Sequence, residues 1–124
     1  MRIRPEKVAH LMRREIADIL ERKIRDPRVS RTVTVTDVEV TNDLSFARVY
    51  VTVMGDAEVR EQVMGGLTRA VGFVRHELGD RLGLREVPEM RFVYDDSLDR
   101  GHRVEDLLRK LERGEPMRDE DGEA

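Results

Sequence analysis

The stretch EVREQVMGGLTRAVGFVRHELGDRLGLR, residues 58–85, decides how the rest of this chain can fold. Apolar residues recur in it at steps of three and four, which places them on one face of an α-helix. They are Val59, Val63, Leu67, Val71, Val74, Leu78 and Leu82. Gly65, Gly66 and Gly72 interrupt the middle, and each interior glycine costs a helix about 1 kcal/mol relative to alanine. The pattern therefore predicts two helical halves, with a kink or break between them, that cover one hydrophobic surface together.

Segments on both sides of this stretch predict a three-stranded sheet. Residues 32–40 and 45–54 are rich in β-branched residues and alternate in polarity, which is typical of two strands in an antiparallel hairpin. The valines of the first segment change parity half-way along, so we expect a β-bulge near Asp37. Residues 89–94, EMRFVY, predict the third strand.

Further helices are expected at the two ends of the chain. A helix is predicted from Pro5 to about Arg25, because apolar residues again follow a helical spacing and Asp26-Pro27-Arg28 would stop it. The residues of this apolar stripe are Val8, Leu11, Met12, Ile16, Ile19, Leu20 and Ile24. Asp56 is a candidate N-cap for the central helix. A short last helix is predicted at residues 103–111. The order is α-β-β-α-kink-α-β plus a C-terminal helix, an α+β fold with a helical layer on one face of a three-stranded sheet.

The composition indicates one modest domain. The chain has 124 residues, of which 39% are hydrophobic and 40% are charged, and it contains no cysteine. No apolar run approaches the roughly 20 residues of a membrane-spanning helix, and the N-terminus lacks the apolar centre of a signal peptide. We expect a cytoplasmic monomer without a membrane partner. Residues 1–112 are predicted to form the folded domain, and residues 113–124 a disordered acidic tail.

Charge is distributed unevenly along the chain. Residues 1–31 hold ten Lys and Arg against five Asp and Glu, a net charge of +5. Residues 112–124 hold two Arg against six Asp and Glu, a net charge of −4. A basic segment favours a polyanionic partner such as RNA, although a solvated helix face of mixed charge would give the same pattern.

The sequence offers little for an enzyme active site. The three histidines do not have the spacing of a zinc site, and no glycine-rich loop precedes a Lys-Ser or Lys-Thr pair. The carboxylates Asp95, Asp96 and Asp99 would suit Mg²⁺, or they would simply end a strand and cap the next helix. We expect no enzyme, no metal and no cofactor. An Mg²⁺-dependent phosphate-handling enzyme stays as an alternative.

A helix-turn-helix on a three-stranded sheet is the arrangement of KH domains, in which a GXXG loop clamps the nucleic-acid backbone. Here residues 69–75 occupy the place of that loop, and they contain no GXXG. An ordered set of segments over residues 4–108 resembles the bacterial ribosome-binding factor A family, in which an Ala-x-Gly kink replaces GXXG, and Ala70-Val71-Gly72 matches that kink. The other segments are Asp26-Pro27-Arg28, residues 33–38, residues 49–53, Gly72-Phe73-Val74-Arg75, Arg85, Pro88-Glu89 and residues 92–97.

The resemblance implies a KH-like (type II) fold and a non-enzymatic, cytoplasmic factor for ribosome biogenesis. Such a factor binds the small (30S) ribosomal subunit and assists late maturation and processing of its 16S rRNA, above all in the cold. It implies an Era-type GTPase as a partner at the same step. Two other binding functions remain open: a generic KH-like protein for single-stranded RNA, and a protein-protein adaptor that uses the first helix.

The candidate RNA-binding residues combine the kink with basic side chains off the apolar stripe. On a helical projection Arg69 lies roughly opposite that stripe, and Arg75 and Arg81 flank it by about 60° each, where guanidinium groups can reach phosphates. Phe73 also lies off the stripe, so it can stack on a base or pack against the first helix. The predicted RNA-binding set is Arg4, Lys7, Arg28, Ala70, Gly72, Arg75, Arg81 and Arg85.

Overall fold

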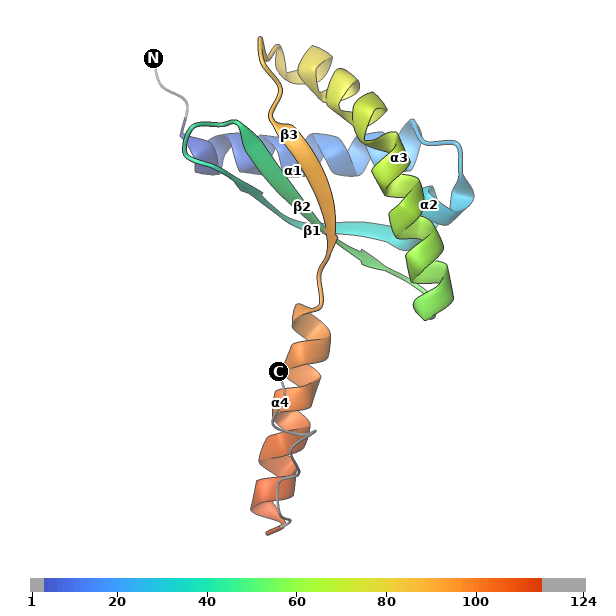
Figure 1. Cartoon of the computed structure of the whole chain (residues 1–124), viewed down its shortest axis with the longest axis vertical. Helices are drawn as coiled ribbons and strands as arrows, with labels where there is room; N and C mark the ends of the chain where they lie inside the picture. Colours follow the sequence, from blue (N-terminus) through green and yellow to red (C-terminus); the bar gives the residue numbers. More distant parts are fainter. Residues whose placement is uncertain (1–3, 115–124) are drawn as a thin grey trace. The chain divides into compact units, whose positions relative to one another are not determined.

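The computed structural model describes the backbone of residues 4–114, and the side chains of residues 4–97 and 105–114. The chain forms two compact units, one ending at Tyr94 and the other beginning at Asp95. The elements in chain order are α1 (Pro5–Arg22), α2 (Pro27–Thr32), β1 (Val33–Val40), β2 (Phe46–Val53), α3 (Ala57–Leu82), β3 (Glu89–Tyr94) and α4 (Ser97–Glu112). Their order and packing confirm the predicted α+β fold with helices on a three-stranded sheet (Figure 1).

The sheet has the strand order β1-β2-β3 and is mixed. β1 pairs with β2 antiparallel, and the pairing register shifts between Val35 and Asp37, which confirms the predicted hairpin and bulge. The shift lets Val35 and Val38 both face the core although they differ in parity. β3 pairs with β2 in parallel, because α3 returns the chain to the end of the sheet at which β2 began.

One face of this sheet is covered by helices. α1 packs on β1, α3 packs on β3, and the two helices contact each other, as Figure 1 shows. The buried side chains form one continuous apolar cluster between the helices and the sheet. Its fully buried large members are Met12, Ile16, Ile19, Val49, Val51, Val63, Leu67, Val74 and Leu78. Leu11 was predicted to lie on the apolar stripe of the first helix, but it is 36% exposed.

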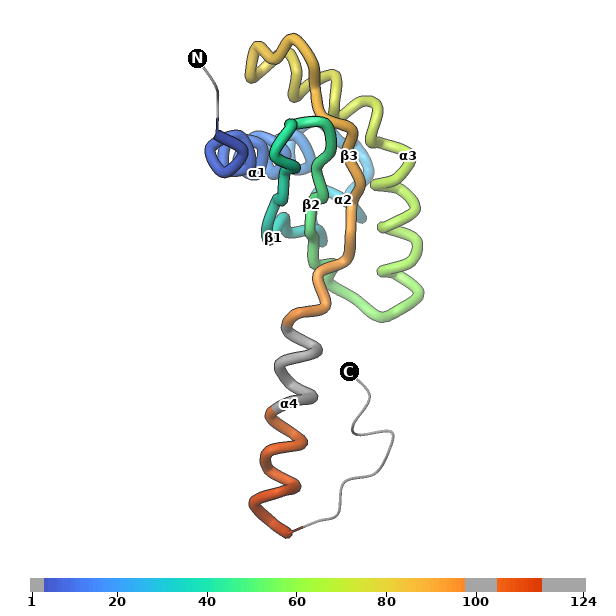
Figure 2. The backbone as a smooth tube through the Cα atoms, turned by 60° about the vertical axis from the view of Figure 1, so that its left-hand side comes forward, coloured from blue at the N-terminus to red at the C-terminus, as the bar shows by residue number. Residues whose placement is uncertain are grey.

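The glycines do not break the central helix. α3 runs without interruption for 26 residues, so the two predicted halves form one helix, and the tube in Figure 2 changes direction part-way along it, which agrees with a kink. Asp56 is its N-cap, as predicted, and the Asp56 carboxylate accepts a hydrogen bond from the Val59 N–H at 2.9 Å. The helix ends at Leu82, and the φ of +63° at its C-cap, Gly83, suits glycine. Burial of the apolar stripe outweighs the glycine penalties, so the helix continues through them.

A short helix, α2, follows α1 where the sequence predicted only a stop. Asp26 is its N-cap and accepts a hydrogen bond from the Arg28 N–H at 3.0 Å, while Pro27 occupies the first turn. Pro27 lacks an N–H, which the first turn does not need, so the same dipeptide that ends one helix begins the next. Val29 on this helix is 4% exposed and joins the core.

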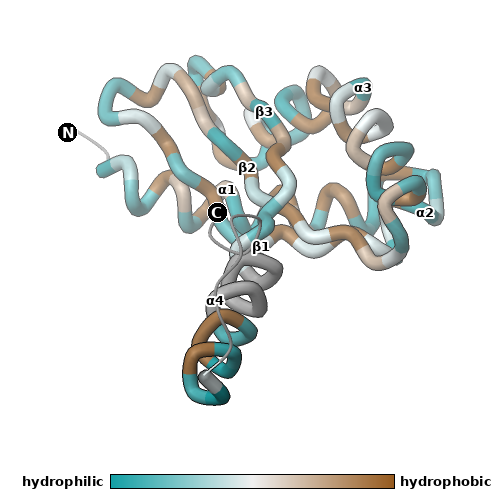
Figure 3. Tube along the Cα trace, turned by 60° about the horizontal axis from the view of Figure 1, so that its bottom comes forward, coloured by the Kyte–Doolittle hydropathy of each residue, from teal (hydrophilic) through white to brown (hydrophobic). Residues whose placement is uncertain are grey.

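The second unit contains α4, which is longer than predicted. It begins at Ser97, six residues before the expected start, and ends at Glu112, with Arg113 as C-cap. Leu108 and Leu111 are more than half exposed, and Figure 3 shows brown and teal residues alternating along this end of the helix. Residues 115–124 of the predicted acidic tail lie outside the described residues. The predicted division into a folded domain of residues 1–112 and a disordered tail of residues 113–124 therefore stays a prediction.

The β1–β2 loop is held by Asp43. Its carboxylate accepts hydrogen bonds from the Ser45 hydroxyl at 2.7 Å, the Thr41 hydroxyl at 2.8 Å and the Ser45 N–H at 3.1 Å. These donors, the Ser45 hydroxyl first and the Thr41 hydroxyl second, lower the pKa of Asp43 from 3.8 to about 2. The ionised carboxylate therefore stabilises the turn between the two strands.

Acid should weaken this turn. A lowered carboxyl pKa contributes stability that is complete above pH 3.8 and is lost as the pH falls toward 2. We expect Asp43→Asn to melt at a lower temperature than the unmodified chain at pH 6, with a gap that narrows steadily at pH 3 and pH 2. Thermal melts followed by circular dichroism measure this gap. A gap that does not depend on pH would show that the charge of Asp43 does not stabilise the turn.

Candidate functional site

The eight candidate residues do not form one patch. Arg4 and Lys7 are exposed at the start of α1, and Arg85 is exposed in the loop after α3. None of these three side chains has a partner within the part of the chain that the structure describes. Arg28 is exposed on α2, which follows the other end of α1 (Figure 1). Four basic groups are thus open to solvent at separate places on the helical layer.

Arg75 is committed to contacts within the protein. Its Nε donates to the Pro88 carbonyl at 3.0 Å, and its Nη2 donates to the Val87 carbonyl at 2.8 Å. The guanidinium therefore fixes the loop that leads into β3, and the side chain is half-buried. A phosphate contact from Arg75 would have to compete with these two hydrogen bonds.

Removing Arg75 should loosen that loop. We expect Arg75→Ala to lower the free energy of unfolding by about 1–3 kcal/mol, since hydrogen bonds from a charged donor are lost and two part-buried carbonyls lose their partners. Urea unfolding measures the change. Arg69→Ala, an exposed position on the same helix, is the matched control and should stay within about 0.5 kcal/mol. Equal losses in both variants would refute a specific role for Arg75 in the loop.

Arg81 joins α3 to α1. Its guanidinium lies 2.6 Å from the Asp18 carboxylate, 3.1 Å from the Glu15 carboxylate and 3.7 Å from the Glu77 carboxylate. The hydrogen bond from Arg81 lowers the pKa of Asp18, and the reciprocal bond to Asp18 raises the pKa of Arg81. The Arg81 side chain is only 22% exposed. Its contacts support helix packing, and its role in RNA binding stays a prediction.

Ala70 and Gly72 have different surroundings. Ala70 is partly buried and packs against the core, whereas Gly72 is exposed. A Cβ built on Gly72 would meet no atom within 4 Å. The next residue, Phe73, is 43% exposed, so it is not sequestered in the core. Gly72 and Phe73 together give a place on α3 where a large partner can come close to the helix backbone.

Because the space around Gly72 is open, we expect a small side chain at this position to stabilise the protein. Gly72→Ala should raise the free energy of unfolding by about 0.5–1 kcal/mol, because alanine is the better helix former and its methyl group meets nothing. Gly79→Ala is the control on the same helix, since its Cβ would lie 2.8 Å from Cγ2 of Val87 and should remove the gain. Thermal melts of both variants test this. A destabilised Gly72→Ala would mean that the glycine is required by the backbone.

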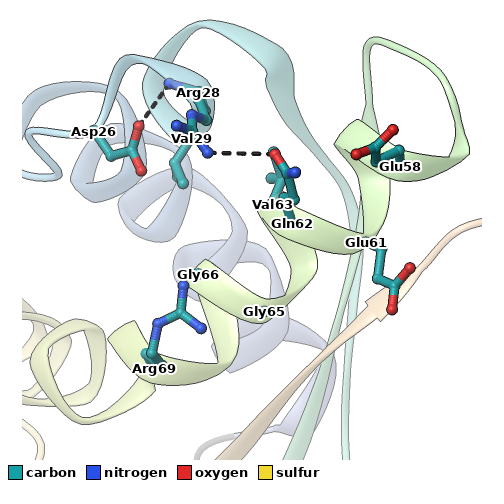
Figure 4. A pocket seen from close by; sticks show the side chains of 10 residues that line it. All are labelled: Asp26, Arg28, Val29, Glu58, Glu61, Gln62, Val63, Gly65, Gly66 and Arg69. Atoms are coloured by element: carbon teal, nitrogen blue, oxygen red, sulfur yellow. Dashed lines mark hydrogen bonds between the residues drawn. The ribbon is translucent and has the colours of Figure 1, made fainter.

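A cavity of about 470 Å³ lies between α2 and the first half of α3 (Figure 4). Arg28 and Arg69 lie on its walls, with Gly65 and Gly66 between them, and Nη1 of Arg28 donates to Oε1 of Gln62 at 3.3 Å. The helical projection places Arg69 away from the core, but Arg69 is not in the predicted RNA-binding set. The cavity also has acidic side chains on its walls: Asp26, Glu58 and Glu61. Its charge is therefore mixed.

One carboxylate of the alternative Mg²⁺ site, that of Asp95, has a structural role. Asp95 accepts a hydrogen bond from the Ser97 N–H at 3.0 Å, at the start of α4. The side chain of Asp99 lies outside the described residues. Among the described side chains, no group of three or more His, Cys, Asp or Glu is placed to hold a metal ion.

The comparison with known families covers nearly the whole of the described chain. The sequence profile of Ribosome-binding factor A matches residues 4–108. The chain belongs to the ribosome-binding factor A family. This family consists of non-catalytic ribosome maturation factors. No helix in the described part of the chain is long and apolar enough to cross a membrane.

Solved structures of the same family share the fold. The crystal structure of ribosome-binding factor A from Thermus thermophilus matches with a TM-score of 0.65 and 24% identity, over 74% of this chain and 97% of that one. The solution structure of a putative ribosome binding factor A from Thermotoga maritima has a TM-score of 0.57 and 32% identity, over 75% and 84%. A homology model of the Thermus thermophilus factor, fitted into a cryo-EM map of a 30S–RbfA complex, has a TM-score of 0.58 and 26% identity, over 72% and 96%.

Proposed function

We propose that this chain binds the small (30S) ribosomal subunit and assists late maturation and processing of its 16S rRNA. The observation that carries the proposal is the family match over residues 4–108. It is supported by the Thermus thermophilus factor, whose coordinates were fitted into a 30S complex. The chain acts without catalysis, so its effect on the subunit comes from preferring one conformation of the RNA to another.

The helical layer supplies the expected contacts. Arg4, Lys7, Arg28 and Arg85 provide charge for phosphates, and Gly72 lets the RNA backbone approach α3 closely. A Cβ at this position meets no atom within 4 Å, so Gly72→Val adds its side chain at an open position of the helix. That variant therefore stays folded and binds the subunit more weakly. Normal binding by a folded Gly72→Val would show that the subunit does not need close access to α3 at Gly72.

The cellular setting follows from the same function. The chain works in the cytoplasm as a monomer, and an Era-type GTPase acts at the same maturation step. Demand for it is greatest in the cold, when misfolded RNA rearranges slowly. The fold lacks a GXXG loop, which favours recognition of a shaped RNA surface over reading of a sequence.

Sedimentation and a deletion strain test the proposal together. Tagged protein in a lysate should co-migrate with free small subunits and not with translating ribosomes. Cells without the protein, grown in the cold, should accumulate 16S rRNA with unprocessed ends while the large subunit matures normally. A normal ratio of precursor to mature 16S rRNA in such cells would overturn the role in processing.

A further inference from the structure

The face of the sheet turned away from α1 and α3 carries aromatic and arginine side chains that the proposed function does not use. Along β2, the buried residues alternate with Phe46, Arg48 and Tyr50, so these three project from the uncovered face. On β3, Arg91 and Val93 alternate with buried Met90 and Phe92 in the same way. We call this surface over β2 and β3 the outer face.

The pairing register brings these side chains next to one another. Arg48 is the partner of Arg91, and Tyr50 is the partner of Val93 in the parallel β2–β3 pair. A hollow of about 580 Å³ lies over them, and no carboxylate is among the residues that line it. The acidic residues of this side of the sheet lie on β1, or at Glu89 where β3 begins. The hollow therefore has a net positive lining.

Arg48 and Arg91 contribute little to the stability of the fold, either through each other or through their contacts with the rest of the protein. Like charges on directly paired residues destabilise a sheet slightly. Arg48 lies 3.8 Å from Glu39, but both side chains are more than half exposed, which makes such a pair weak. Arg91 is exposed and has no side-chain partner in the part of the chain described. Stability of the fold alone does not account for this pair of cations.

The aromatic rings are half-buried and held in place. Tyr50 donates its hydroxyl hydrogen to Oε2 of Glu39 at 3.2 Å, which fixes the orientation of the ring across the sheet. Phe46 lies two residues before Arg48 on the same strand face. Tyr94 also lines the hollow, but the Arg60 guanidinium already lies 3.9 Å from its ring centroid. Phe46 and Tyr50 are therefore the rings available to a flat ligand.

We propose that the outer face binds a single-stranded segment of RNA, with phosphates on Arg48 and Arg91 and bases stacked on Phe46 and Tyr50. The proposal rests on the proposed function and adds a second RNA contact, on the opposite side of the sheet from the helical layer. Aromatic rings beside arginines on an open sheet suit unpaired bases, because paired bases keep their faces inside the duplex. The cavity beside α2 is less suited to RNA, since three carboxylates line it.

Fluorescence anisotropy with a ten-nucleotide oligouridine RNA and the matching duplex tests the proposal on the full chain. We expect the single strand to bind more tightly than the duplex. Arg48→Ala/Arg91→Ala and, separately, Tyr50→Leu should each weaken single-strand binding at least about fivefold. Tyr50→Phe keeps the ring and should change binding less than about twofold. Arg13→Ala/Arg14→Ala, which removes two exposed arginines from α1, is the charge-matched control and should bind as the unmodified chain does.

The outcomes separate this site from the proposed function. Affinity for 30S subunits is measured with the same variants: an unmodified chain that does not bind 30S refutes the proposed function itself. A chain that binds 30S but not the single strand overturns the outer-face site. So does an equal loss in the α1 control, or no loss in the outer-face variants. Titrating the unmodified chain with the single-stranded RNA tests the site without substitutions. The site predicts changes in the amide NMR chemical shifts of Arg48, Tyr50 and Arg91. Changes only at other residues would contradict it.

Discussion

Replacing Arg4, Lys7, Arg28 and Arg85 together with alanine should remove much of the salt dependence of binding to the 30S subunit. Each phosphate contact contributes about 0.7–0.9 to the slope of log affinity against log salt, so four contacts contribute about 3. Between 50 and 200 mM salt, the unmodified chain should therefore lose about a hundredfold more affinity than the variant. These four side chains are exposed, and among them only Arg28 has a described side-chain contact, the hydrogen bond to Gln62, so all four can make phosphate contacts without disturbing the core.

The matched comparison is Arg75→Ala/Arg81→Ala, which removes arginines that already have partners inside the protein. Arg75 binds two carbonyls, and Arg81 lies among three carboxylates. We expect this double variant to lose stability but to keep the salt slope within about one of the unmodified chain. Affinities measured across salt for the three proteins decide the matter. A similar fall in slope for both variants would contradict the division into exposed and committed arginines.

Leu67→Ala should destabilise the domain more than any surface substitution. Leu67 is 0% exposed at the middle of α3, and truncating a buried leucine costs about 2–5 kcal/mol through lost burial and the cavity left behind. Domains of this size are stable by only about 5–15 kcal/mol, so the loss takes a large share of the total. Urea unfolding monitored by circular dichroism should show a clearly lower midpoint.

Leu11→Ala is the control for this prediction. Leu11 was expected in the core from the same kind of helical spacing, but the structure leaves it 36% exposed. We expect its loss to stay within about 1 kcal/mol. Similar destabilisation by the two substitutions would show that the packing around α3 differs from the structure described above.

Local patterns in the sequence were enough to predict most of the fold. The parity change among the valines of β1 located the bulge that the register shows between Val35 and Asp37. The sequence pattern does not predict α2, because Asp26-Pro27 marks the end of the preceding helix, although Asp before Pro also begins helices. The glycines of α3 suggested a division that tertiary packing overrides, since residues on both sides of them are buried in one core.

The site was less predictable, because the decisive contacts join residues far apart in the sequence. A helical projection can place Arg81 beside the apolar stripe, but it cannot show that Glu15 and Asp18 lie against it. The same holds for Arg75 and the carbonyls of residues 87 and 88. The outer face was also missed, since Arg48 and Arg91 become neighbours only through the parallel pairing of β2 with β3.

That parallel pairing also determines when the sheet can be completed as the chain is made. β1 and β2 are joined by a short turn and can pair early, but about 40 residues separate the end of β2 from the end of β3. At about 5–20 residues per second, synthesis of that segment takes roughly 2–8 seconds. During this interval one edge of β2 has no neighbouring strand. Its unpaired backbone N–H and C=O groups can then form hydrogen bonds with a strand of another chain. α3 must then return the chain to this edge, so docking of β3 should be a late step in folding.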